Sequence, residues 1–122
     1  MAISAEYREF VRDLLASFGQ VQIRALFGGC GIYLDDVMFG LVFDEQIYLK
    51  VDDVNRPDFE AAGQPAFVYP LKTGATASMS FYLIPDNLYD DADEMAAWAA
   101  KAFAAAQRSV KKKSPRKARK RR

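Results

Sequence analysis

A glycine-rich stretch is the first part of the sequence that could do chemistry. Phe27 is followed by Gly28, Gly29 and Gly31. Glycine-rich loops cradle phosphate groups when their backbone amides converge at the start of a helix. Here the next residues, which include Tyr33, are typical of a strand, so that geometry is missing. The sequence therefore favours a structural interpretation, in which the glycines permit a bulge or a hairpin with positive φ.

The single cysteine and the lack of histidine narrow the catalytic options. A nucleophilic thiol needs a histidine, a close cation or a helix N-terminus, and the nearest cation to Cys30 in the sequence is Arg24. Without histidine, the chain lacks the commonest general base and the commonest metal ligand. We therefore expect a buried structural thiol and no catalytic residue, metal site or cofactor. One cysteine and no signal peptide also favour a reducing, cytoplasmic setting.

Five acidic pairs are the next candidates, because paired carboxylates serve acid–base catalysis or bind hard cations. Each pair falls at an expected turn or helix start, where solvated acids are common, and this favours a structural role. The pairs are Asp35-Asp36, Asp44-Glu45, Asp52-Asp53, Asp90-Asp91 and Asp93-Glu94.

Aromatic residues on the expected strands could instead stack single-stranded RNA. Such surfaces also use cations, and here only Arg24, Lys50 and Lys72 lie in the strand region. The sequence therefore disfavours nucleic-acid binding by the sheet. The aromatic residues in question are Tyr33, Tyr48, Phe67, Tyr69 and Tyr82.

The C-terminal segment is the strongest compositional signal. Residues 111–122 hold nine cations and no acid, whereas residues 1–110 hold eight cations and sixteen acids. Composition predicts a disordered tail over 109–122 that contacts a nucleic-acid backbone without reading its sequence. Two alternatives stay open: the tail solubilises an acidic body, or it docks on that body. The cations of the tail are Lys111, Lys112, Lys113, Arg116, Lys117, Arg119, Lys120, Arg121 and Arg122.

The length of 122 residues supports one domain, expected over residues 1–108. Apolar periodicity predicts a first helix over 4–18 and a last helix that ends near 108, with Asp91 or Asp93 as its N-cap. A short helix after Asp52 or Asp53 as N-cap ends at Gly63. Six strands are expected at about 21–27, 30–34, 37–43, 46–51, 66–69 and 76–84, with a helical turn at 86–90. The order α-β-β-β-β-α-β-β-α predicts a two-layer α+β fold, an antiparallel sheet of five or six strands with helices packed on it.

The strand at 37–43 is apolar on both of its expected faces. Such a strand is central and covered on both sides, or shares one face with a partner. This keeps open a second hypothesis, a protein-binding or homodimerisation module with no nucleic-acid role. Strict alternation puts Val37, Phe39, Leu41 and Phe43 on one face and Met38, Gly40 and Val42 on the other.

The chain resembles the N-terminal domain of the TfoX/Sxy family, regulators of natural competence in bacteria. The resemblance covers about residues 5–106. It implies a two-layer α+β domain and a non-enzymatic role in transcription regulation, in which longer members act with the cAMP receptor protein. Longer members also carry a second helical domain, where this chain has the basic tail. The resemblance rests on Phe27-Gly28-Gly29-x-Gly31-Ile32-Tyr33, Tyr48-Leu49-Lys50, Asn55-Arg56-x-x-Phe59 and Met79-Ser80-Phe81-Tyr82-x-x-Pro85.

Overall fold

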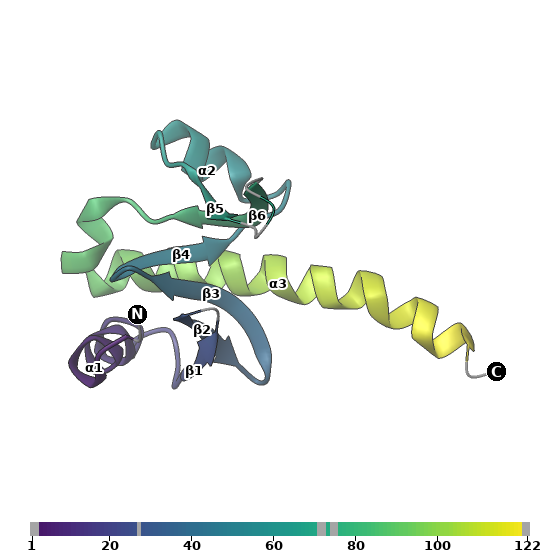
Figure 1. Cartoon of the computed structure of the whole chain (residues 1–122), viewed down its shortest axis with the longest axis horizontal. Helices are drawn as coiled ribbons and strands as arrows, with labels where there is room; N and C mark the ends of the chain where they lie inside the picture. Colours follow the sequence, from purple (N-terminus) through teal and green to yellow (C-terminus); the bar gives the residue numbers. More distant parts are fainter. Residues whose placement is uncertain (1–2, 27, 71–72, 74–75, 121–122) are drawn as a thin grey trace.

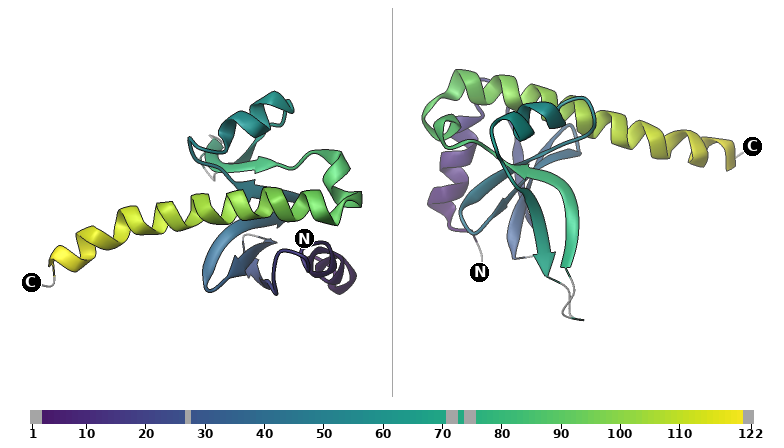
Figure 2. Two further views of the ribbon diagram at one scale, coloured as in Figure 1. Left: turned by 180° about the vertical axis from the view of Figure 1, so that it is seen from behind. Right: turned by 90° about the horizontal axis from the view of Figure 1, so that it is seen from above.

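The computed structural model describes residues 3–26, 28–70, 73 and 76–120. In this part of the chain a six-stranded antiparallel sheet carries helices on one face, as Figures 1 and 2 show. The predicted α+β class and element order are confirmed. The elements are α1 (Ala5–Leu14), β1 (Gln22–Leu26), β2 (Gly29–Leu34), β3 (Val37–Phe43), β4 (Gln46–Lys50), α2 (Arg56–Ala61), β5 (Ala66–Pro70), β6 (Thr76–Leu83), the 3₁₀ helix η1 (Asp86–Asp90) and α3 (Ala92–Lys120).

The strands lie in the order β1-β2-β3-β4-β6-β5, and every neighbouring pair is antiparallel. Two-residue turns join β2 to β3 and β3 to β4. Asp35, Asp36, Asp44 and Glu45 all have positive φ, between 52° and 64°. A type I′ hairpin turn requires positive φ at both of its central residues. The structural interpretation of these two acidic pairs is therefore confirmed.

A β-bulge in β3 corrects the predicted faces of that strand. Ile32 pairs with Gly40 and Tyr33 pairs with Met38, so Phe39 is an extra residue on β3. The bulge reverses the alternation that follows it, and the prediction that Phe39, Leu41 and Phe43 share a face is wrong. Val37, Phe39 and Val42 pack with the main core, whereas Met38, Leu41 and Phe43 belong to a second cluster.

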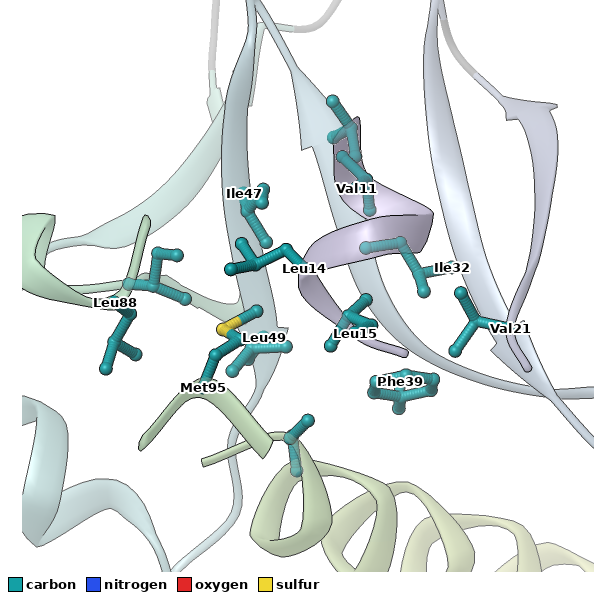
Figure 3. Packing of buried hydrophobic residues seen from close by; sticks show 14 of the residues in the cluster. Val11, Leu14, Leu15, Val21, Ile32, Phe39, Ile47, Leu49, Leu88 and Met95 are labelled. Carbon is teal, nitrogen blue, oxygen red and sulfur yellow. The ribbon is translucent and has the colours of Figure 1, made fainter. Parts of the chain in front are cut away.

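The main core lies between the sheet and the helices, as Figure 3 shows. α1 begins at Ser4, whose Oγ accepts a hydrogen bond from Tyr7 N at 3.1 Å. The first α-helix ends at Leu14, four residues before the predicted end, and the chain continues in turns. Small side chains let α3 approach the sheet closely. The buried small residues of α3 are Ala99, Ala102, Ala105 and Ala106.

The opposite face of the sheet carries a smaller cluster built from strands. Leu41, Phe67 and Phe81 are buried there, and Tyr48 packs its ring 4.9 Å from that of Phe67. Among the described residues, no side chain of a helix belongs to this cluster. β3 is therefore a central strand that packs on both faces, as one of the two alternatives predicted.

The last helix runs further than expected. α3 continues to Lys120, so the predicted helix end near 108 is wrong, while the predicted disorder of residues 109–122 stays a prediction. The lysines, arginines and alanine of residues 111–120 are good helix formers, and adding residues to an existing helix avoids the cost of nucleation. Pro115 opposes this extension, because an interior proline removes a backbone hydrogen bond and costs a helix about 3 kcal/mol. The predicted domain boundary at 108 stays a prediction.

Candidate nucleic-acid interface

The basic segment leaves the body as a continuation of α3. Figure 1 shows this helix crossing the sheet and continuing beyond it toward the C-terminus. The predicted contact residues from Lys111 to Lys120 all lie in this helical extension, and the Lys111 side chain is exposed. Arg121 and Arg122 lie outside the described residues. The structure therefore joins the cationic segment directly to a helix that is anchored in the core.

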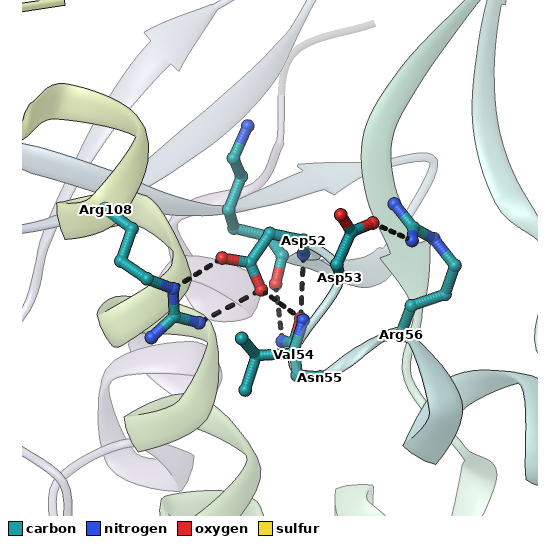
Figure 4. Close-up of polar contacts among 7 residues, drawn as sticks. Asp52, Asp53, Val54, Asn55, Arg56 and Arg108 are labelled. Atoms are coloured by element: carbon teal, nitrogen blue, oxygen red, sulfur yellow. Dashed lines mark hydrogen bonds and ion pairs between the residues drawn. The ribbon is translucent and has the colours of Figure 1, made fainter. Parts of the chain in front are cut away.

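An ion pair fixes α3 at the point where it leaves the body. Arg108 donates from Nε to Asp52 Oδ2 at 2.6 Å and from Nη2 to Asp52 Oδ1 at 3.0 Å, as Figure 4 shows. Both N–H groups meet one carboxylate, which is the strong bidentate geometry of arginine. The two residues are 56 positions apart in the sequence. The pair therefore ties α3 to the loop between β4 and α2.

A buried asparagine shapes that loop. Asn55 is 1% exposed; its Oδ1 accepts from Asp52 N at 2.8 Å, and its Nδ2 donates to the Lys50 carbonyl at 2.9 Å. Asp52 Oδ1 also accepts from Val54 N at 3.0 Å. The expected N-cap role of Asp52 or Asp53 is wrong, because α2 starts after Asn55. Asp52 instead accepts from Val54 N in the turn before α2 and pairs with Arg108, a long-range contact that local sequence does not reveal.

Arg108 lowers the pKa of Asp52 from 3.8 to about 2, chiefly through its hydrogen bonds to the carboxylate. A carboxyl with a lowered pKa stabilises the fold above its unfolded pKa and loses that contribution as the pH falls. The Asp52 side chain is 28% exposed, so after solvent screening we expect about 1–2 kcal/mol. The unfolding free energy of wild type minus that of Asp52→Asn should therefore shrink between about pH 4 and pH 2, as urea titrations would measure. A constant difference across that range would contradict this expectation.

Three cations from different elements surround a hollow at this junction. The hollow has a volume of about 240 Å³ and is lined by Lys50 of β4, Arg56 of α2 and Arg108 of α3, with both loop aspartates. Lys50 Nζ donates to Ser80 Oγ at 2.7 Å, and Arg56 Nη1 forms an ion pair with Asp53. The remaining lining residues are Val51, Ala105 and Ser109. We call this site the junction hollow. Sequence reasoning missed it, and the only local signal was the Asp52-Asp53 pair beside Lys50 and Arg56.

The glycine motif has the structural role that the sequence favoured. Gly28 has a φ of 82°, and a Cβ at Gly29 would lie 2.2 Å from the Val42 carbonyl oxygen. A Cβ at Gly31 would lie 2.8 Å from Met38 Sδ. The motif therefore packs β2 tightly against β3 and forms no loop at a helix start. Phe27 lies outside the described residues. The guanidinium group of Arg24 lies over the Tyr33 ring, with Cζ 4.5 Å from the ring centroid.

The structure offers little else that could do chemistry. Cys30 is 1% exposed, so the prediction of a buried thiol is confirmed. No cluster of three potential metal-ligating side chains occurs among the described residues. Within the same ranges, no helix combines the length and the apolar character that crossing a membrane requires.

Comparison with known proteins places the fold in a family. The family model for the TfoX N-terminal domain matches residues 13–106. The chain is also similar to Protein Sxy of Escherichia coli (strain K12), with 24% identity over 78 residues. The match covers 64% of this chain and 37% of Sxy, so the chain spans little more than a third of that relative's length.

Proposed function

Because the chain belongs to the TfoX N-terminal domain family, we propose that it is a non-catalytic regulatory domain that contacts nucleic acid through the extension of α3. Its role in competence or transcription regulation is part of this proposal, which the likeness to Sxy supports. The extension supplies affinity for the phosphate backbone, and partners bound by the body supply specificity.

The separation of charge along the chain is the observation that carries the proposal. Residues 1–110 have a net charge of −8, and residues 111–122 have a net charge of +9. An acidic body is repelled by a polyanion, so most of the attraction must come from the extension. The helical backbone of residues 111–120 continues away from the body in Figure 2.

The test is the salt dependence of binding to duplex DNA. If all nine cations met phosphates, the logarithm of the association constant would fall against the logarithm of salt concentration with a slope of about −8, which is an upper limit. We expect a steep slope for the wild type and a nearly flat one for a full-length variant with these nine cations replaced by glutamine. Fluorescence anisotropy with a labelled duplex measures both.

A matched control replaces two cations of the body that lie away from the extension, Arg12→Gln and Lys101→Gln. Both residues form exposed ion pairs, with Glu9 at 3.2 Å and Asp58 at 3.0 Å. Losing these exposed ion pairs should cost little stability, so the control should stay folded. Because the extension is intact, the control should bind DNA as the wild type does. Equal affinity of the wild type and the glutamine variant, or no binding by either, would refute the proposal.

Self-association is the second candidate, and the strand-built cluster favours it. Met38, Phe43 and Tyr48 are only partly buried on the face of the sheet opposite the main core. A second copy that covered this face would bury their exposed parts. Analytical ultracentrifugation over a wide concentration range tests this candidate, and a monomer at every concentration would exclude it.

A further inference from the structure

We propose that the junction hollow is a phosphate-binding site on the body of the domain. This inference rests on the proposed function, in which the phosphate belongs to the nucleic-acid backbone that the extension of α3 also contacts. The hollow would then add a defined contact, made by the folded body, to the attraction of the extension.

Cations are concentrated at one place on an acidic body. The structure describes seven cationic side chains within residues 1–110, and three of these line the hollow. Two carboxylates share the same lining, so the charged residues of the hollow sum to +1 on a body whose net charge is −8. The seven side chains are those of Arg8, Arg12, Arg24, Lys50, Arg56, Lys101 and Arg108.

The two arginines of the hollow carry more N–H donors than their ion pairs use. An arginine carries five N–H groups, so a carboxylate that accepts one or two of them leaves others for a second anion. Arg108 uses Nε and Nη2 toward Asp52, and Arg56 uses Nη1 toward Asp53. The ion pairs thus hold the guanidinium groups in place. Ser80 and Ser109 add hydroxyl groups to the lining, and the Ser80 hydroxyl accepts from Lys50, which leaves its proton able to meet a phosphate oxygen.

The hollow lies next to the start of the basic segment. Arg108 and Ser109 line the hollow, and the basic segment begins at Lys111 in the same helix. The sequence then places Lys112 and Arg116 four and eight residues beyond Arg108, and positions four apart follow one another on one helical face. A backbone that tracks this helix therefore reaches the hollow. The volume of about 240 Å³ lies below the usual range of small-molecule pockets and suits a phosphate group.

The experiment uses the full-length double variant Lys50→Gln with Arg56→Gln. Removing the one phosphate contact of the hollow should make the salt slope on duplex DNA shallower by about 0.9. The variant Lys101→Gln is the matched control, because Lys101 lies on α3 and pairs with Asp58 outside the hollow; its slope should equal that of the wild type. Thermal melts confirm that each variant is folded.

Inorganic phosphate provides a readout that does not depend on DNA. In ¹H–¹⁵N spectra it should shift the amide signals of Ser80 and Ser109 in the wild type and leave them in place in the double variant. An unchanged salt slope in the double variant overturns the inference, while the steep slope of the wild type still supports the proposed function. If the wild type fails to bind DNA but phosphate shifts these signals, the proposed function fails and the hollow stands as a site for free phosphate. Absence of the phosphate shifts counts against the hollow in either case.

Discussion

Replacing Phe39 with alanine is expected to lower the free energy of unfolding by about 3–5 kcal/mol, the usual cost of removing a buried aromatic ring. Phe39 is fully buried on β3. Its ring centroid lies 5.3 Å from that of Phe18 and 5.8 Å from that of Phe103. The three rings join the end of the α1 region, the sheet and α3. Because three different elements meet at this ring, none can move alone to fill the cavity.

Urea titration and thermal melting measure this effect. For a domain of this size, the expected loss corresponds to a fall in Tm of roughly 10–25 °C. Val54→Ala is the control, because Val54 is 69% exposed and its truncation should change stability by less than about 0.5 kcal/mol. A Phe39→Ala protein as stable as the control would show that the aromatic cluster does not hold α3 on the sheet.

Much of the fold was predictable because its elements follow local rules. The acidic pairs at Asp35-Asp36 and Asp44-Glu45 separate apolar runs, and they form the expected tight turns. Asp91 Oδ1 accepts from Glu94 N at 3.1 Å, so the expected cap of the last helix is also confirmed. These features depend on residues within a few positions of one another, which is the range over which sequence patterns carry information.

The bulge in β3 shows where local pattern fails. In the sequence, Phe39 and Gly40 fit the alternation of a regular strand. In the structure, these two residues of β3 lie opposite the single residue Ile32 of β2. A Cβ at Gly40 would lie 3.1 Å from both Ile32 Cδ1 and the Tyr48 carbonyl oxygen, so this position on β3 has little room. The crowding depends on two neighbouring strands at once. Neither the two-residue period of a strand nor the 3.6-residue period of a helix reveals this crowding in the sequence.

The candidate site was predictable only in part, for the same reason. The cationic segment is visible in composition, because nine charges in twelve residues need no structure to be recognised. The junction hollow joins residues that the sequence separates by up to 59 positions, from Lys50 to Ser109. Its formation depends on α3 lying across the end of β4, where Arg108 reaches Asp52. Asp52 keeps a local hydrogen bond to Val54 N in the turn before α2, and its additional pairing with Arg108 is a tertiary contact that local pattern does not record.

Replacing Gly29 with alanine is expected to destabilise the fold by about 3 kcal/mol, at the upper end of the usual cost of overpacking. The added Cβ would lie 2.2 Å from the Val42 carbonyl oxygen and 3.1 Å from Phe43 Cδ1. The nearest obstacle is backbone of β3, which is held between β2 and β4 and cannot turn aside as a flexible side chain would. The substitution must therefore separate β2 from β3 or shift their register.

Gly19→Ala is the matched control for this prediction. A Cβ at Gly19 would meet the two methyl groups of Leu34 at 3.6 Å, an ordinary contact distance. The same chemical change should therefore be neutral, or stabilise the protein by up to about 1 kcal/mol through the lower entropy of its unfolded chain. Urea titration of the two variants under identical conditions gives the comparison. Equal stabilities would mean that β3 yields easily at Val42, and the close packing of β2 on β3 would then not explain why glycine stands at position 29.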